Sequence, residues 1–177
     1  MGPKSVIETR TLRLVPCELA HFEAILEDHP RLGQTLGMKI TDGWLQFPES
    51  MRVGYEYLRA NPAALGWWTY LFTHISDNAL IGNGGFAGPA DVDGMVEIGY
   101  SIAPEYRNRG LATEAARGLI SFAFASPQIR MVDAHTLSEV NPSTSVLERV
   151  GMKRIGTATD PDEGEVWHWR LMREDYD

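Results

Sequence analysis

Cysteine is almost absent from this sequence, which contains only Cys17. An internal disulfide is therefore excluded. Because Cys17 has apolar neighbours and no nearby base in the sequence, we expect it to pack as an inert side chain. Long apolar runs are also absent, so no segment is suited to span a bilayer. The N-terminus lacks the apolar core of a signal peptide, and a cytoplasmic location is expected.

Basic residues are scarce relative to acidic ones, since 16 Lys and Arg against 24 Asp and Glu give a formal net charge of −8. Nucleic acids and anionic membranes favour a basic protein surface, so neither is expected as the main partner. Metal-ligand spacing between histidines and Cys or acidic residues is missing as well, and no metal is expected. Structural roles are expected for the five histidines, His21, His29, His74, His135 and His168.

The proportions of hydrophobic and charged residues in the sequence are those of an ordinary globular domain. Hydrophobic residues make up 44% and charged residues 23% of the 177 residues, which is sufficient for one hydrophobic core. No repeat, low-complexity tract or linker divides the chain. We therefore predict a single domain over residues 1–177, present as a monomer or a homodimer.

Hydrophobic spacing predicts a mixture of strands and helices. The predicted strands are residues 11–15, 67–75, a strand from 80 onward, 95–102, 130–137, 152–158 and 165–173. The predicted helices are residues 18–28, 48–60, 110–125 and 142–150, while residues 30–47 are predicted to be irregular. This order of elements indicates an α/β domain with a mixed sheet.

Four small residues, Gly82-Asn83-Gly84-Gly85, follow the start of the strand at Leu80. A phosphate-binding loop would contain such residues, and so would a strand with a bulge or a close backbone approach. Strand-like sequence on both sides favours the second interpretation.

Residues 97–115 carry the strongest chemical signal in the chain. A strand is followed by a turn containing Arg107, Arg109 and Gly110, and then by the long helix. The first amides of a helix have no internal partner and the helix dipole makes this end partly positive, so a pyrophosphate fits there. The turn lacks the ending of a Walker loop and the glycine pattern of a dinucleotide fingerprint. On these residues alone, a helix start with solvated arginines remains the alternative.

The turn Arg-Asn-Arg-Gly-Leu-Ala at 107–112 resembles the acyl-CoA pyrophosphate motif of GNAT acetyltransferases, Arg/Gln-x-x-Gly-x-Gly/Ala. Its flanks, Glu-Ile-Gly-Tyr at 97–100 and Ala-Thr-Glu-Ala at 112–115, are similar to the branch that contains the ribosomal-protein N-terminal (alanine) acetyltransferases. Residues 141–152 resemble the second cofactor segment of that branch. The three motifs occur in the family's order within residues 80–156.

The resemblance implies a GNAT-like α/β fold, whose mixed, mostly antiparallel sheet splays between its central strands at 95–102 and 130–137 and is flanked by helices. It also implies an enzyme that transfers acetyl from acetyl-CoA to a primary amine, on a protein N-terminus or a small molecule, by direct attack in a ternary complex. Pantetheine would lie in the splay like an added strand, and amides of the turn would hold the pyrophosphate. The implied cofactor-binding residues are Tyr100, Ser101, Ile102, Arg107, Arg109, Gly110, Leu111, Ala112, Thr113, Asn141 and Ser143.

One departure from the branch concerns the second segment. The branch usually has Asn three residues before the Ser that corresponds to Ser143, whereas this chain has Val140 there and Asn141 one residue closer. Asn141 either contacts pantetheine or only caps the following helix. The Ser143 hydroxyl either donates a proton on the thiol side or bonds only to backbone.

Amine acetylation requires a base, because an alkyl ammonium has a pKa of about 10 and must lose a proton before it attacks. Glu97 lies on the strand beside the expected thioester, on the same face as Gly99 and Ser101. A carboxylate there is costly without a partner or a function, so Glu97 is either a structural hydrogen-bond or ion-pair partner or a base acting through ordered water. The amide near Ile102 is the expected oxyanion donor.

Two other functional interpretations remain open. A non-catalytic acyl-CoA binding or sensing module would use the same pyrophosphate motif, and a domain for another nucleotide is disfavoured only by the missing motifs. Trp67, Trp68, Trp167 and Trp169 are expected mainly in the core, with one or two beside a substrate pocket. The acidic turn at 160–163 is expected to be a solvated hairpin.

Overall fold

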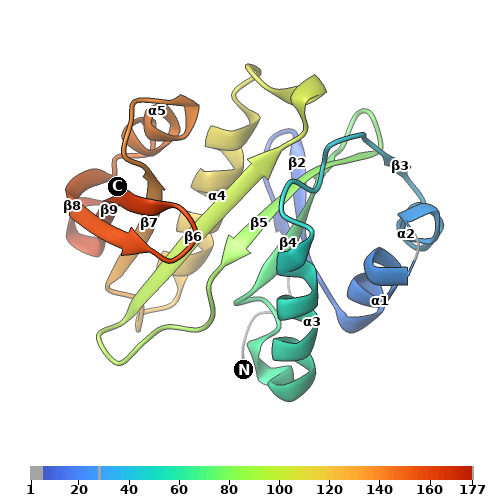
Figure 1. Ribbon diagram of the computed structural model, residues 1–177, viewed down its shortest axis with the longest axis horizontal. Helices are drawn as coiled ribbons and strands as arrows, with labels where there is room; N and C mark the ends of the chain where they lie inside the picture. The colour runs from blue at the N-terminus through green and yellow to red at the C-terminus, as the bar shows by residue number, and fades with distance from the viewer. Residues whose placement is uncertain (1–5, 28, 177) are drawn as a thin grey trace.

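The computed structural model describes residues 6–27 and 29–176, which form one mixed sheet with helices on both faces (Figure 1). The strands are β1 (Ile7–Glu8), β2 (Leu12–Pro16), β3 (Lys39–Ile40), β4 (Thr69–His74), β5 (Ala79–Phe86), β6 (Met95–Ile102), β7 (Met131–Leu137), β8 (Lys153–Asp160) and β9 (Gly164–Met172). The helices are α1 (Leu19–Glu27), α2 (His29–Leu36), α3 (Glu49–Ala60), α4 (Leu111–Ala125) and α5 (Pro142–Arg149), with 3₁₀ turns at Pro62–Ala64, Pro104–Tyr106 and Arg173–Asp175.

The sheet is mostly antiparallel, in the order β1-β2-β4-β5-β6-β7-β9-β8, with β3 beside β5. Among the described strands, only the β3–β5 and β6–β7 pairings are parallel. The α/β class and the mixed, mostly antiparallel sheet flanked by helices are confirmed.

Strand alternation sends neighbouring side chains into two cores, one on each face of the sheet. Tyr70 and Phe72 of β4 lie in the core that contains α4, whereas Leu71 lies in the core that contains α1, α2 and α3. On β6, Val96 and Ile98 belong to the α4 core. Glu97, Gly99 and Ser101 therefore point to the opposite face, where α3 lies.

The predicted helices and longer strands are present with shifts of a few residues at their ends, but the prediction that residues 30–47 are irregular is wrong. This segment contains α2 and β3, and Leu32 of α2 is fully buried beside α1. β3 exists because Lys39 and Ile40 pair with Ala79 and Leu80 of β5, a contact between distant segments that hydrophobic spacing does not reveal. The short edge strand β1 was also missed.

The glycines at 82–85 lie within β5, which confirms the interpretation as a close backbone approach. A Cβ atom added at Gly82 would lie 2.2 Å from the Ser101 carbonyl oxygen, and one added at Gly84 would lie 2.3 Å from that of Gly99. Side chains at these positions would push β5 away from β6.

Cys17 is buried, and burial raises the pKa of its thiol, with a further contribution from Glu18. This agrees with the expected inert packing. No helix among the described residues combines the length and the hydrophobicity that crossing a bilayer requires.

Candidate active site

The sheet opens in its middle because β6 and β7 pair over only three residues. Met95, Val96 and Glu97 lie beside Met131, Val132 and Asp133, and beyond Glu97 the strands separate. The predicted splay between β6 and β7 is therefore present (Figure 1). Glu97, the last paired residue of β6, lies at its apex. A parallel pair that separates leaves backbone groups unpaired on the facing edges of both strands, here β6 and β7.

The backbone groups that face this opening can be assigned from strand alternation. The Glu97 carbonyl accepts from the Ala87 amide and the Ala103 amide donates to Ile81, so odd-numbered residues of β6 face β5. The amides and carbonyls of the even-numbered residues, including Tyr100 and Ile102, consequently face the opening. They form an edge to which an extended chain of hydrogen-bonding groups can bind.

One of these backbone carbonyls already accepts hydrogen bonds from side chains. Gln46 Nε2 and Arg107 Nε both donate to the Ile102 carbonyl, at 3.2 and 3.1 Å. Ile102 is therefore left with its amide for a ligand, while Tyr100 can offer both its amide and its carbonyl.

The turn before α4 has the backbone geometry of an anion site. Asn108 and Gly110 have positive φ angles of 61° and 75°, and Gly110 is the N-cap of α4 without a side-chain cap. The first amides of α4 point outward from this turn without intrahelical acceptors. Thr113 Oγ1, one turn into the helix, is buried and has no hydrogen-bond partner among the described residues. These features fit a pyrophosphate.

The two arginines of the turn are exposed, and each also has a local role. Arg107 reaches the Ile102 carbonyl, and its amide donates to the Pro104 carbonyl at 3.3 Å. Arg109 donates to the Glu105 carbonyl and lies 4.8 Å above the Tyr106 ring. Their charge is available to a phosphate, but the Arg107 amide is already engaged within the turn.

Two cavities meet at the opening of the sheet. One, of about 520 Å³, lies on the α3 side and is lined by Phe47, Met51, Trp68, Asn83, Phe86, Glu97, Gly99, Tyr100, His135 and Ser143, among others. The other, of about 600 Å³, runs toward the α4 turn and is lined by Gln46, Tyr100, Ile102, Arg107, Ala112, His135, Asn141 and Ser143, among others. Tyr100, Ser101, His135, Thr136 and Ser143 are among the residues that line both.

Glycine contributes to the first cavity by leaving space. A Cβ atom added at Gly99 would meet nothing within 4 Å. Gly99 lies on the same face of β6 as Glu97, so the missing side chain opens room directly beside the carboxylate. Trp68, stacked on Tyr57 with ring centroids 4.4 Å apart, closes the far wall. This agrees with the expectation that one tryptophan lies beside a pocket.

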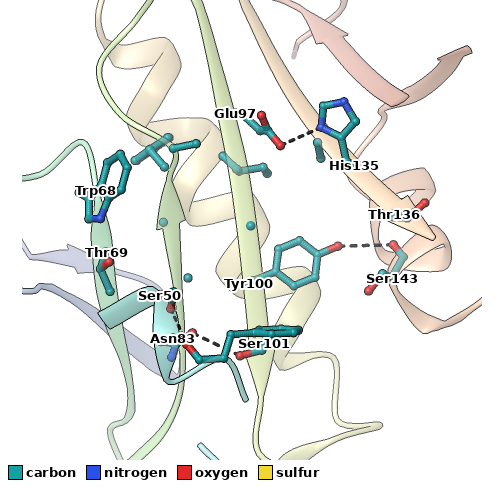
Figure 2. Close-up of a pocket in the computed structure, with 18 of the residues that line it drawn as sticks. Ser50, Trp68, Thr69, Asn83, Glu97, Tyr100, Ser101, His135, Thr136 and Ser143 are labelled. Carbon is teal, nitrogen blue, oxygen red and sulfur yellow. Dashed lines mark hydrogen bonds and ion pairs between the residues drawn. The ribbon is translucent and has the colours of Figure 1, made fainter. Parts of the chain in front are cut away.

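Glu97 is paired with a residue that sequence reasoning assigned only a structural role. Its Oε1 lies 2.7 Å from Nδ1 of His135 on β7, across the apex of the opening (Figure 2). Both side chains are partly exposed, at 37% for Glu97 and 30% for His135. The pair thus lies at the wall of the α3-side cavity and not in the core, and His135 also lines the other cavity.

A second set of charged groups lies behind His135. The His135 and His168 rings stack with centroids 4.6 Å apart, and His168 Nε2 lies 2.6 Å from Asp133 Oδ2. Arg170 donates to both carboxylate oxygens of Asp133. Burial by itself would raise the pKa of Asp133, but the hydrogen bonds from Arg170 and His168 outweigh it and leave the pKa below its usual value.

Asn141 caps α5 in the structure. Its side-chain Oδ1 accepts from the Thr144 backbone amide at 3.0 Å, and its backbone amide donates to Thr144 Oγ1 at 3.1 Å. These two hydrogen bonds complete a capping box. Asn141 also lines the cavity that runs toward the α4 turn. Capping is therefore present, and a contact with pantetheine stays a prediction.

Ser143 and Tyr100 approach each other across the opening. The Tyr100 hydroxyl donates to the Ser143 carbonyl oxygen at 3.4 Å (Figure 2). Burial raises the pKa of the Tyr100 phenol well above its usual value, so the phenol keeps its proton. Both residues thus lie where the two cavities join, and their contact with a thioester stays a prediction.

The site also contains residues that the sequence analysis did not single out as functional. His135 and Gln46 come from β7 and from the loop before α3, so no contiguous motif contains them. Asn83, read only as part of a glycine-rich strand, has a buried Nδ2 without a partner among the described residues, while its Oδ1 accepts from Ser101. No three His, Cys, Asp or Glu side chains in the described part of the chain are grouped to hold a metal ion.

An open strand edge beside a helix N-terminus with a positive-φ glycine turn, in a sheet splayed at this point, defines the class of acetyl-CoA-dependent N-acetyltransferases. The sequence profile described as the Acetyltransferase (GNAT) domain matches residues 11–153, which is more than half of the chain. The chain therefore belongs to the GNAT acetyltransferase family.

Curated relatives and solved structures agree with this assignment. The Bacillus subtilis protein described as the uncharacterized N-acetyltransferase YjdG is 26% identical over 166 residues, covering 93% of this chain and 96% of that protein. The structure of RimL, the ribosomal L7/L12 alpha-N-protein acetyltransferase, in complex with coenzyme A is 17% identical with a TM-score of 0.69, covering 95% of this chain and 98% of that one. The ribosomal-protein-S5-alanine acetyltransferase of Vibrio fischeri is 15% identical with a TM-score of 0.68, covering 98% and 99%.

Proposed function

We propose that this enzyme transfers the acetyl group of acetyl-CoA to a primary amine by direct attack in a ternary complex. The observation that carries the proposal is the meeting of two cavities at Tyr100, His135 and Ser143, one running toward the α4 turn and the other toward α3, where Glu97 lines it beside His135. Each of two substrates then has its own approach to one reaction point. We also propose that residues 1–177 act as one catalytic domain, as a monomer or a homodimer.

The cavity on the α4 side suits the acetyl-CoA. The amides at the start of α4, from Gly110 to Thr113, would hold the pyrophosphate, with Arg107 and Arg109 adding charge. The pantetheine would bind the open edge of β6 through Tyr100 and through the Ile102 amide, with Ser101, Asn141 and Ser143 beside it. Ser143 would lie next to the sulfur and donate the proton that the leaving thiol needs.

The cavity on the α3 side suits the amine. Apolar and aromatic residues, including Phe47, Met51 and Trp68, form most of its lining. Among the lining residues in the described part of the chain, Glu97 and His135 are the only ones of the types Asp, Glu, Lys, Arg or His. A polyamine would leave further ammonium groups without carboxylates, and a free amino acid would place its carboxylate without a cation. The lining therefore favours one amine on an apolar, uncharged body, such as a protein N-terminus or a small apolar amine.

The oxyanion donor belongs nearer to Glu97 than the sequence suggested. A strand rises about 3.3 Å per residue, so Ile102 lies roughly 16 Å along β6 from Glu97 and Tyr100 roughly 10 Å. Ile98 directly follows the last residue paired with β7. Tyr100 is then the first residue clear of β7 whose amide faces the opening, and we assign its amide as the donor to the developing oxyanion.

The experiment is a screen for acetyl-CoA-dependent thiol release with four amine classes: a peptide with a free N-terminus and an amidated C-terminus, an apolar monoamine, a free amino acid and a polyamine. Thiol release with the first two and little with the last two is expected. A rise in Tm with acetyl-CoA should accompany it, since a ligand that binds only the native state stabilises that state. A Tm rise without thiol release from any amine would indicate a sensing module, and no Tm rise would contradict acetyl-CoA binding.

A further inference from the structure

We propose that His135 is the residue that takes the proton from the attacking amine, and that Glu97 acts by orienting His135. This inference rests on the proposed function and identifies the base within it. Sequence reasoning placed the base at Glu97 and treated His135 as structural, so the inference comes from the tertiary contact between β6 and β7.

The tautomer of His135 follows from its partner. An ionised carboxylate can only accept hydrogen bonds, so Nδ1 carries the proton in the 2.7 Å contact with Glu97 Oε1. The other ring nitrogen, Nε2, then keeps its lone pair and can accept a proton. The carboxylate also stabilises the imidazolium that forms, so Glu97 assists without touching the amine.

The position of His135 allows it to act. His135 lines both cavities, whereas His168, the ring stacked on it, is not among the lining residues of either cavity. His168 is engaged through its Nε2 with the buried Asp133. Of the two stacked imidazoles, only His135 therefore reaches the space where the amine and the thioester would meet.

The charged groups that face His135 come from three strands. Glu97 of β6 contacts it directly, His168 of β9 stacks on it, and Asp160 at the end of β8 is close enough to interact with it electrostatically. The pKa of Asp160 lies below its usual value mainly because the Glu163 and Asp162 amides donate to it, with a small contribution from His135.

The proton balance closes without another reactant. One ammonium proton moves to Nε2 of His135, and the amine nitrogen forms its bond to the acetyl carbon. The C–S bond then breaks, and the second proton lost by the nitrogen goes to the sulfur by way of Ser143 or solvent. The imidazolium of His135 returns its proton to solvent, so the products are the amide, the thiol and one released proton.

The test compares His135→Ala, Glu97→Gln and a control, His74→Ala, which removes an imidazole on β4 that lines neither cavity. His135→Ala should lower kcat by roughly 10²-fold or more, the usual loss for a general base. Because His135 is partly exposed, added imidazole should restore a good part of this loss. Glu97→Gln should lose less, since the amide oxygen still accepts from Nδ1. His74→Ala should keep kcat and show no response to imidazole.

The pH profile and acetyl-CoA binding separate the remaining outcomes. The acid limb of kcat/KM that a general base produces should persist in Glu97→Gln and vanish in His135→Ala. Near-normal kcat in His135→Ala would overturn the inference while leaving the proposed function standing. An inactive His135→Ala that imidazole does not restore would overturn it too, as would loss of its acetyl-CoA-induced Tm rise. If the wild type transfers no acetyl group, the proposed function fails and this inference with it.

Discussion

Two substitutions of Asn141 can separate its contribution to the stability of the protein from its contribution to acetyl-CoA affinity. Its Oδ1 caps α5, and the residue also lines the cavity assigned to pantetheine. Asn141→Ala removes both the cap and the side-chain amide. Asn141→Asp keeps an oxygen that can accept from the Thr144 amide but loses the NH₂ donor, and a carboxylate at a helix N-terminus is favourable.

The expected magnitudes follow from the two roles. Losing a helix cap costs about 1 kcal/mol, which for a domain of this size lowers Tm by about 2–4 °C. Losing one neutral hydrogen bond to the cofactor costs about 0.5–1.5 kcal/mol, equivalent to a rise in KM for acetyl-CoA of about 2- to 10-fold. We expect Asn141→Ala to show both effects, and Asn141→Asp to show the KM effect with Tm nearly unchanged.

Thermal unfolding followed by circular dichroism and initial rates at varied acetyl-CoA measure the two quantities on the same samples. If both variants keep the wild-type KM, Asn141 does not contact the cofactor and only caps α5. If Asn141→Ala keeps the wild-type Tm, the capping box seen in the structure contributes nothing to stability, and the reasoning about the cap is wrong.

Three other predictions concern the turn, the cavity and the buried carboxylate. Gly110→Val should weaken acetyl-CoA binding measured by calorimetry. The control Gly164→Val has a similar φ of 78° and equally open surroundings, so it should carry the same backbone strain and bind acetyl-CoA normally. Equal affinities in the two folded variants would place the phosphate elsewhere. Gly99→Val should fill the α3-side cavity and raise KM for the amine several-fold with little change in Tm; an unchanged KM would show that the amine binds elsewhere. Because the folded-state pKa of Asp133 is depressed, its stabilisation is present above the unfolded pKa of about 4 and lost as pH falls through the lower folded value. The free energy of unfolding, measured by urea between pH 7 and pH 3, should therefore decrease less with falling pH in a folded Asp133→Asn variant than in the wild type. An identical decrease in both proteins would contradict this role.

The parts of the site that the sequence predicted are those made by contiguous residues. The turn at 107–112 and the start of α4 have the backbone geometry expected of an anion site, because helix amides and a positive-φ glycine are properties of one short segment. The same holds for β6, whose bounds match the prediction, and for the cap at Asn141. By contrast, β3 and α2 were missed because distant strand pairing and packing against α1 stabilise them.

The sequence by itself thus determined the family, the order of the main elements and the glycine turn before α4, since hydrophobic period and local motifs act within a few residues. Only the tertiary structure decided that Glu97 meets His135, 38 residues further along the chain. That contact depends on the register that places Glu97 beside Asp133 and on the separation of β6 from β7 immediately afterwards. A strand register is selected by packing on both faces of the whole sheet, and no single segment contains that information.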